Sequence, residues 1–177
     1  MMKRIGLAML VMCAFARGAL AGPGEAWCES TGGHVVVRTP AYGTNNPNPL
    51  LLANPQPFCV YTNAADQSKI ELAVRTLVTT KPTLAALAYY AKVKPHLKKC
   101  VGNPASCYCT QLGGTDLFGG INLGGGGWVT ADNPTNVEDA CVFPDLSMID
   151  AWGLTYHAVG TIRGIDLAKV LQYPNPN

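Results

Sequence analysis

The chain contains the stretch Cys28-Glu29-Ser30-Thr31-Gly32-Gly33, and its cysteine and glycine pair return as Cys109-Thr110-Gln111-Leu112-Gly113-Gly114. The next cysteine of the pattern follows after 31 positions in the first copy (Cys59) and after 32 in the second (Cys141). Each of these opens a similar phrase, Cys-Val-Tyr in one copy and Cys-Val-Phe in the other. An internal duplication explains these echoes better than chance does.

Two further echoes follow in the same order. The pattern Asp-x-Ser-x-Ile occupies residues 66–70 and 145–149. Three residues near the end of each copy also match at identical spacing: Leu84, Leu87 and Tyr90 with Leu167, Val170 and Tyr173. We therefore predict two related units, residues 22–91 and 104–177, joined by a basic linker over residues 92–103.

The duplication constrains the disulfides, because equivalent cysteines should pair equivalently in two copies of one fold. This predicts Cys28–Cys59 and Cys109–Cys141, and leaves Cys100–Cys107 to clip the connecting segment. Closing a loop of about 30 residues removes roughly 3.5 kcal/mol of unfolded-state entropy. A zinc site is disfavoured, because the closely spaced cysteines 107 and 109 have no second close pair beside them.

Residues 1–21 have the pattern of a secretory signal peptide. Lys3 and Arg4 form the charged start, residues 5–15 the apolar run, and Ala19-Leu20-Ala21 a small-x-small cleavage site. Cleavage after Ala21 removes one of the seven cysteines and leaves six, an even number that suits a periplasmic or secreted protein.

The length and composition of the chain exclude several classes of function. With 177 residues, 48% hydrophobic and 14% charged, the chain is long enough for one domain or two very small ones. The leader carries three of the 13 basic residues, so 13 − 3 = 10 remain against 11 acidic ones. A net charge of −1 argues against a nucleic-acid partner. No stretch after the leader has the roughly 20 apolar residues of a transmembrane span.

The predicted fold class is α+β, with two disulfide-braced units, each containing a short helix, antiparallel strands and a closing helix. Asn103 and Pro104 are typical of a helix start. Alternation over residues 68–79 favours a strand, although Ser68 followed by Glu71 also fits a helix capping box. The expected helices are 25–31, 104–113, 82–92 and 164–172, and the expected strands are 34–39, 58–62 and 68–79.

The favoured function is a non-enzymatic binding or inhibitory module that presents its long loops, Tyr42–Pro57 and Gly119–Gly127, to a macromolecular partner. Candidate partner contacts are Trp128 and a basic cluster between the units: Lys92, Lys94, Lys98 and Lys99. A second hypothesis is a cell-envelope structural protein, in which this cluster contacts an anionic surface.

A third hypothesis is a secreted hydrolase. Ser147, His157 and either Asp145 or Asp150 supply the residue types of a catalytic triad. Because the first copy keeps the Asp-x-Ser pattern without an equivalent histidine, a structural turn is favoured over catalysis. No cofactor or metal is expected, since the three histidines lie in no metal-binding spacing and the glycine-rich stretch lacks a phosphate-loop ending.

The second copy resembles a small exported bacterial domain, the domain of unknown function 333, often labelled a hemolysin. The resemblance rests on Asn103-Pro104-Ala105-Ser106-Cys107-Tyr108-Cys109, on Gly113-Gly114, on Cys141-Val142-Phe143-Pro144-Asp145-Leu146-Ser147 and on Trp152. It implies an exported bacterial protein without assigned catalytic residues. This chain departs from the family in having Leu146 at a turn glycine and Ile149 where another cysteine often stands.

Overall fold

The computed structural model describes residues 22–116 and 124–176. The predicted signal peptide and most of the Gly119–Gly127 loop lie outside these residues, as does the side chain of Lys99. The statements that follow concern the described part of the chain.

The chain alternates short helices and strands. In order, the elements are α1 (Pro23–Ser30), β1 (His34–Tyr42), β2 (Leu50–Leu51), β3 (Gln56–Thr62), β4 (Lys69–Ala73), α2 (Val74–Val78), α3 (Leu84–Ala91), η1 (Leu97–Lys99), α4 (Pro104–Gln111), β5 (Gly126–Thr130), β6 (Asn133–Glu138), β7 (Ala140–Val142), β8 (Met148–Asp150), α5 (Ala151–Ala158) and η2 (Leu167–Lys169).

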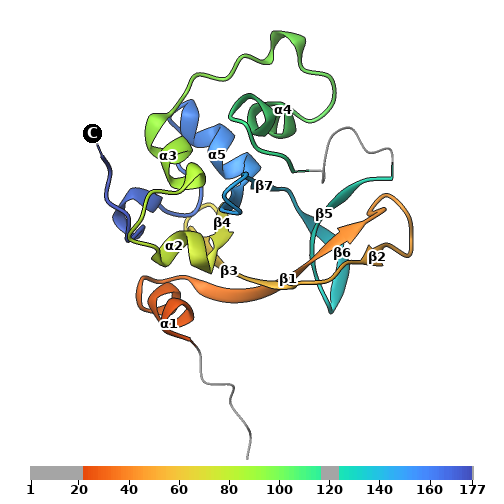
Figure 1. Ribbon diagram of the computed structural model, residues 1–177, viewed down its shortest axis with the longest axis horizontal. Coiled ribbons are helices and arrows are strands. Elements are labelled where there is room, and N and C mark those ends of the chain that lie inside the picture. Colours follow the sequence, from red (N-terminus) through yellow and green to blue (C-terminus); the bar gives the residue numbers. More distant parts are fainter. Residues whose placement is uncertain (1–21, 117–123, 177) are drawn as a thin grey trace, which may run out of the picture.

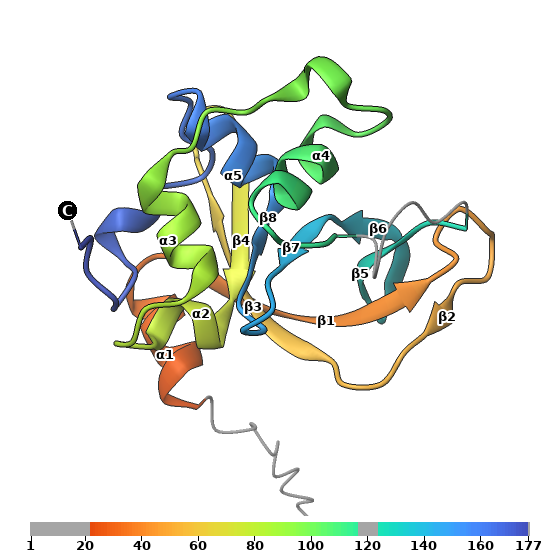
Figure 2. The same cartoon turned by 45° about the horizontal axis from the view of Figure 1, so that its top comes forward.

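One antiparallel sheet runs through both halves of the sequence. Its strand order is β6-β5-β1-β3-β4-β8-β7, with β2 paired to β1, and it curls into a half-barrel (Figures 1 and 2). The α+β class is confirmed, but the prediction of two separate units is wrong. The two halves join at two places in the sheet: β4 pairs with β8, with Leu72 opposite Ile149, and β1 pairs with β5, with Pro40 opposite Trp128. These pairings satisfy backbone groups that separate units would leave at open sheet edges.

The two faces of the sheet carry different cores, because successive side chains of a strand point to opposite faces. Tyr61 and Leu72 belong to the main core, together with buried residues of the helices. Phe58 and Ala73, their neighbours along β3 and β4, pack with Trp128 in a second, smaller core. The helices labelled α2, α3 and α5 lie on one side of the sheet, and the β1–β2 end extends away from them (Figure 2).

The predicted duplication has a counterpart in local structure. In each half a short helix ends in the glycine pair, and the second glycine lies against the disulfide. A Cβ atom added at Gly33 would lie 2.5 Å from Cys59 Sγ, and one added at Gly114 would lie 2.5 Å from Cys141 Sγ. Only glycine permits this close approach of backbone to sulfur.

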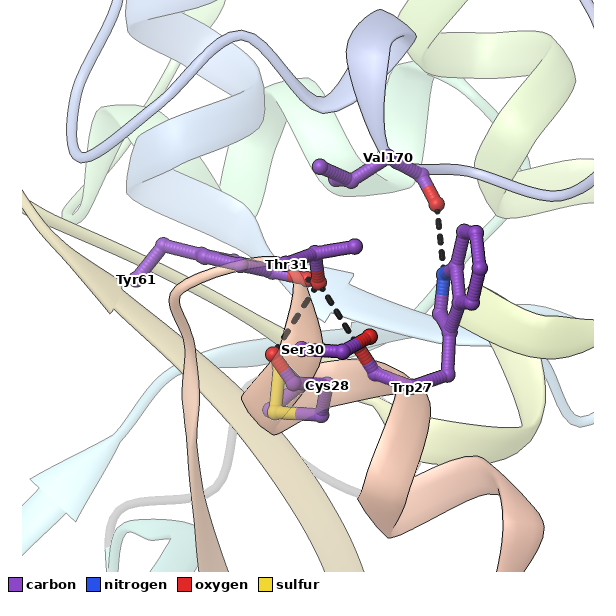
Figure 3. Close-up of a disulfide and its surroundings, with 7 residues drawn as sticks. Trp27, Cys28, Ser30, Thr31, Tyr61 and Val170 are labelled. Carbon is purple, nitrogen blue, oxygen red and sulfur yellow. Dashed lines mark hydrogen bonds between the residues drawn. A yellow bond between two sulfur atoms is a disulfide. The ribbon is translucent and has the colours of Figure 1, made fainter.

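The structure contains the three predicted disulfides, Cys28–Cys59, Cys100–Cys107 and Cys109–Cys141. Figure 3 shows the first of them beside Trp27 and Thr31. Three disulfides in one small chain are consistent with an oxidising location, extracellular or periplasmic.

The closing segments of the two halves are exchanged. Helix α3 belongs to the first half, but the amide of Leu84 donates to Asp145 Oδ2 at 2.8 Å and that of Ala85 to Ser147 Oγ at 3.0 Å. The Asp-x-Ser turn of the second half therefore caps a helix of the first.

The reciprocal contacts hold the segment around η2 against the first half. The amide of Gly164 donates to Ser68 Oγ at 3.0 Å, and the indole N–H of Trp27 donates to the carbonyl of Val170 at 2.9 Å (Figure 3). Each half thus supplies hydrogen-bond partners to the closing segment of the other.

Two predicted elements differ from the structure. The strand expected over residues 68–79 ends at Ala73, and α2 follows, because packing against α1 at Gly24 favours a helix there. The helix expected over residues 164–172 is only the single turn η2. Beyond it the amide of Gln172 donates to the carbonyl of Leu77 in α2 instead of continuing a helix. Helix α5 was not predicted.

Candidate functional site

The first candidate site is a group of exposed apolar residues at the far end of the sheet, which we call the apolar ribbon: Tyr42, Leu50, Leu51 and Leu52. Their exposed fractions are 48%, 67%, 53% and 42%. Scattered apolar residues are normal on a protein surface, but a contiguous group of large ones is typical of an interaction site.

Backbone hydrogen bonds fix the ribbon. Tyr42 lies opposite Leu50 in the β1–β2 pair, and the amide of Leu52 donates to the carbonyl of Pro40 at 2.8 Å. The turn that follows β1 is held to β5, because the amide of Gly43 donates to the carbonyl of Gly125 at 2.8 Å. The leucines are therefore presented on an ordered strand pair, which reduces the entropy that a partner would have to remove on binding.

The second candidate site, the acidic pocket, is a cavity of about 340 Å³. Strand β6, the end of β8, helix α5 and the segment after α5 contribute its lining: Val137, Glu138, Asp139, Asp150, Trp152, Tyr156 and Arg163. Three carboxyl groups and one guanidinium thus meet beside two aromatic rings. The volume lies within the range of about 300–1,000 Å³ typical of small-molecule sites.

A buried ion pair lies close to the acidic pocket. Arg38 of β1 donates through Nε to Glu71 Oε2 at 2.7 Å and through Nη2 to Oε1 at 2.8 Å. Both residues are only 4% exposed. Because the Arg38 guanidinium and the Glu71 carboxylate neutralise each other in this bidentate pair, Arg38 does not balance the charge of the other carboxyl groups in the pocket.

Burial disfavours the ionised form of the carboxyl groups in the pocket. Burial, with the negative charge of Glu71 adding to it, raises the pKa of Asp150 to about 7, against the opposing effects of nearby amides and of Arg163. Burial and the charge of Asp150 likewise raise the pKa of Glu138 well above its ordinary value. Two close carboxyl groups in a dry site cannot both be charged at low cost.

The other wall of the pocket is aromatic. Trp152 and Tyr156 stand one turn apart on α5 with ring centroids 5.9 Å apart. The guanidinium carbon of Arg163 lies 5.2 Å from the centroid of the Tyr156 ring, a cation–π arrangement. Asp139 is fixed by two side chains: Asn103 donates to its Oδ2 at 3.0 Å, and the Trp152 side chain also hydrogen-bonds to its carboxyl group.

The structure gives Ser147 and His157 separate surroundings. The Ser147 hydroxyl donates to Asp145 at 2.6 Å and accepts from the α3 amide described above. The His157 ring stacks on Tyr89 with centroids 3.6 Å apart, and burial lowers its pKa. Among the described residues no hydrogen bond joins His157 to Ser147, so the arrangement of a catalytic triad is not formed here.

Of the predicted partner contacts, the lysines are exposed and Trp128 is buried. Lys92, Lys94 and Lys98 are exposed on the connection between α3 and α4. Trp128 is instead a core residue, 6% exposed, with its ring centroid 5.3 Å from that of Phe58. Because the curled sheet turns this side chain inward, Trp128 does not contribute to a contact surface.

The described residues contain no group of three or more histidine, cysteine, aspartate or glutamate side chains able to hold a metal ion. Within the same ranges, every helix is too short or too polar to cross a bilayer. Comparisons with protein-family models, with curated proteins and with solved structures find no match to this chain. The resemblance stated above for the second copy therefore stays a prediction.

Sequence reasoning identified part of the acidic pocket and missed the rest. Asp150 was named as a candidate triad carboxylate, and Trp152 among the residues that carry the resemblance. Glu138, Asp139 and Arg163 were not, because their meeting depends on how β6, β8 and α5 come together. The one available signal was the clustering of acidic residues at 138 and 139 just before a cysteine.

Proposed function

We propose that the protein is an exported, non-enzymatic binding or inhibitory module whose protein partner contacts the apolar ribbon. The observation that carries this proposal is the exposure of Leu50, Leu51 and Leu52 on a strand pair that backbone hydrogen bonds hold in place. The ribbon belongs to the Tyr42–Pro57 loop, which the sequence singled out as a candidate contact.

The position of the ribbon supports the proposal. It projects from the β1–β2 end of the sheet, away from the helices that cover the main core (Figures 1 and 2). Tyr42 and Leu50 lie opposite each other and share one face of the strand pair, whereas Leu51 lies on the other face, so a partner that clasps the strand pair would bury these side chains. Burial of one leucine side chain contributes about 1.5–3 kcal/mol before the costs of association.

The test replaces Leu50, Leu51 and Leu52 together by serine. The wild-type protein, recovered from the exported fraction of its own cells, should elute in size-exclusion chromatography as a stoichiometric complex with one partner. The triple variant should elute as the free chain with an unchanged melting temperature, because the replaced side chains are already in water.

A matched control changes exposed apolar residues elsewhere. Val101 and Val159 are 83% and 64% exposed and lie outside the ribbon. Their replacement by serine should leave the complex intact. The proposal is wrong if the triple variant keeps the complex, or if the wild-type protein forms none.

A further inference from the structure

We propose that the acidic pocket binds one organic monocation, a guanidinium or primary ammonium group, between its carboxyl groups and its aromatic wall. The proposal is independent of the apolar ribbon, since the two sites share no residue. It rests on the charge balance, an unsatisfied carboxyl oxygen, the aromatic lining and the size of the cavity.

The carboxyl groups around the acidic pocket outnumber the positive charges there. The charged groups that act on one another here are Glu71 of β4, Arg38 of β1, Glu138 at the end of β6, Asp139 just after it, Asp150 of β8 and Arg163 after α5, with Asp116 beside Asp139. Arg38 and Glu71 neutralise each other through their two hydrogen bonds. Three carboxyl groups then remain against the single guanidinium of Arg163, so the pocket has room for added positive charge.

One carboxyl oxygen of the pocket lacks a hydrogen-bond donor in the described part of the chain. Glu138 Oε1 exposes less than 1 Å² and has no hydrogen-bond partner among the described residues. A buried acceptor without a donor costs about 1–3 kcal/mol. Glu138 lines the cavity, so a rotation of its side chain would turn this oxygen toward a donor held there. A charged N–H group would supply that donor.

The chemistry of the lining selects the kind of cation. The described residues do not bring together three ligands for a metal ion, whereas the aromatic side chains of Trp152 and Tyr156 in the lining suit an organic cation. Arg163 over the Tyr156 ring shows the same interaction made within the chain. A cavity of about 340 Å³ accommodates a guanidinium or ammonium group with part of its carbon stem.

The test uses the whole exported chain and two matched probes. N-acetyl-arginine amide carries the guanidinium, and N-acetyl-citrulline amide replaces it by a neutral urea of nearly the same shape. Titration at constant ionic strength, followed by the NMR signal of the Trp152 indole N–H, should give saturable shifts with the arginine probe only. A titration with N-acetyl-lysine amide, which carries a primary ammonium group and no guanidinium, shows which of the two cations the pocket prefers.

Two variants locate the site. Glu138→Gln should weaken binding of the arginine probe about tenfold, which corresponds to the loss of one charge-assisted hydrogen bond. Asp139→Asn should weaken it less, because the Asp139 carboxyl group already accepts hydrogen bonds from Asn103 and Trp152. This second variant also tests the site if Glu138→Gln does not fold. Asp132→Asn is the control, because Asp132 is exposed on the turn between β5 and β6 and should leave the affinity unchanged.

Proton release provides a second readout. Since the pKa values of Asp150 and Glu138 are both raised, a bound cation should drive protons off them. Calorimetry at pH 6 in two buffers of different ionisation enthalpy should therefore show release of protons, and affinity should rise as pH increases through about 7. Equal binding of the citrulline probe, no binding of either probe at millimolar concentration, or binding without proton release overturns the proposal.

Discussion

Leu146 and Gln67 occupy the same place in the two Asp-x-Ser turns, and both adopt left-handed backbone conformations. Their φ angles are 64° and 58°. A residue with a Cβ atom pays about 1–2 kcal/mol in this region, which glycine does not. The resemblance to the exported domain implies glycine at position 146, and the backbone there has the conformation that glycine prefers.

Leu146→Gly should therefore stabilise the protein. The side chain of Leu146 is 58% exposed, so little apolar burial is lost. Relief of the backbone strain stabilises the folded protein, and part of this gain is offset because glycine adds entropy to the unfolded chain. We therefore expect the free energy of unfolding, measured in urea, to rise by about 0.5–1 kcal/mol. Gln67→Gly should act in the same direction. Val159→Gly, at φ −104°, should give no gain; a gain there, or none at 146, would contradict the argument.

Asp150 makes stability depend on pH. Its pKa is about 7 in the folded protein and about 3.9 in an unfolded chain, so between these values the folded state holds more protons. The contribution of Asp150 to stability is therefore fully present below pH 4 and is lost as pH rises through 7, by up to about 1.4 kcal/mol per pH unit.

Asp150→Asn should reduce this dependence, with Glu138 and Asp139 keeping part of it, and should be the more stable protein at pH 8. The measurement is the free energy of unfolding of both proteins from pH 4 to pH 8. Asp132→Asn should retain the wild-type slope over this range, because hydrogen bonds lower the pKa of this exposed carboxyl. The same slope in the Asp150 variant and the wild-type protein would show that this carboxyl is not the source.

The start of helix α3 depends on a turn 60 positions further along the chain. Three of its first amides are satisfied by side chains, those of Thr83, Asp145 and Ser147, at 3.2, 2.8 and 3.0 Å. A helix of this length has little intrinsic stability, so these caps and its packing decide whether it forms.

Ser147→Ala should lower the free energy of unfolding by about 1–2 kcal/mol, because it leaves the buried amide of Ala85 without an acceptor. Hydrogen exchange of the first amides of α3 should become faster, although the substitution lies in another half of the sequence. Ser30→Ala is the control, since the Ser30 hydroxyl donates only to the carbonyl of Trp27 on an exposed surface. Unchanged exchange in α3 would mean that the cap contributes nothing.

The elements that sequence predicted well are those whose signals are local. Asn103 accepts from the amide of Ala105 at 2.9 Å, as the Asn-Pro helix start implies, and α4 follows directly. The failures concern distant contacts. Alternation over residues 68–79 could not show that α2 would pack on α1, or that the buried carboxylate of Glu71 would pair with Arg38. The acidic pocket was partly missed for the same reason.

The exchange of closing segments predicts that the halves fold only together. Residues 22–91 expressed alone would leave α3 without the turn that caps it, and residues 92–177 would leave the segment around η2 without α1 and α2. Each fragment should be unfolded by circular dichroism and by NMR. An equimolar mixture should recover native signals if the Cys28–Cys59 and Cys109–Cys141 disulfides are intact. Independent folding of either fragment would contradict the shared architecture.

Partner recognition by the apolar ribbon is the central claim for the whole molecule, and site-specific photo-crosslinking tests it most directly. A photoreactive amino acid placed at Leu51 in the producing cells should link the protein to one partner at near-stoichiometric yield. The same amino acid at Val101, which is exposed on the far connection between α3 and α4, should give no such product. Crosslinking to the same partner from Val101 but not from Leu51, or no partner from Leu51, would contradict the account.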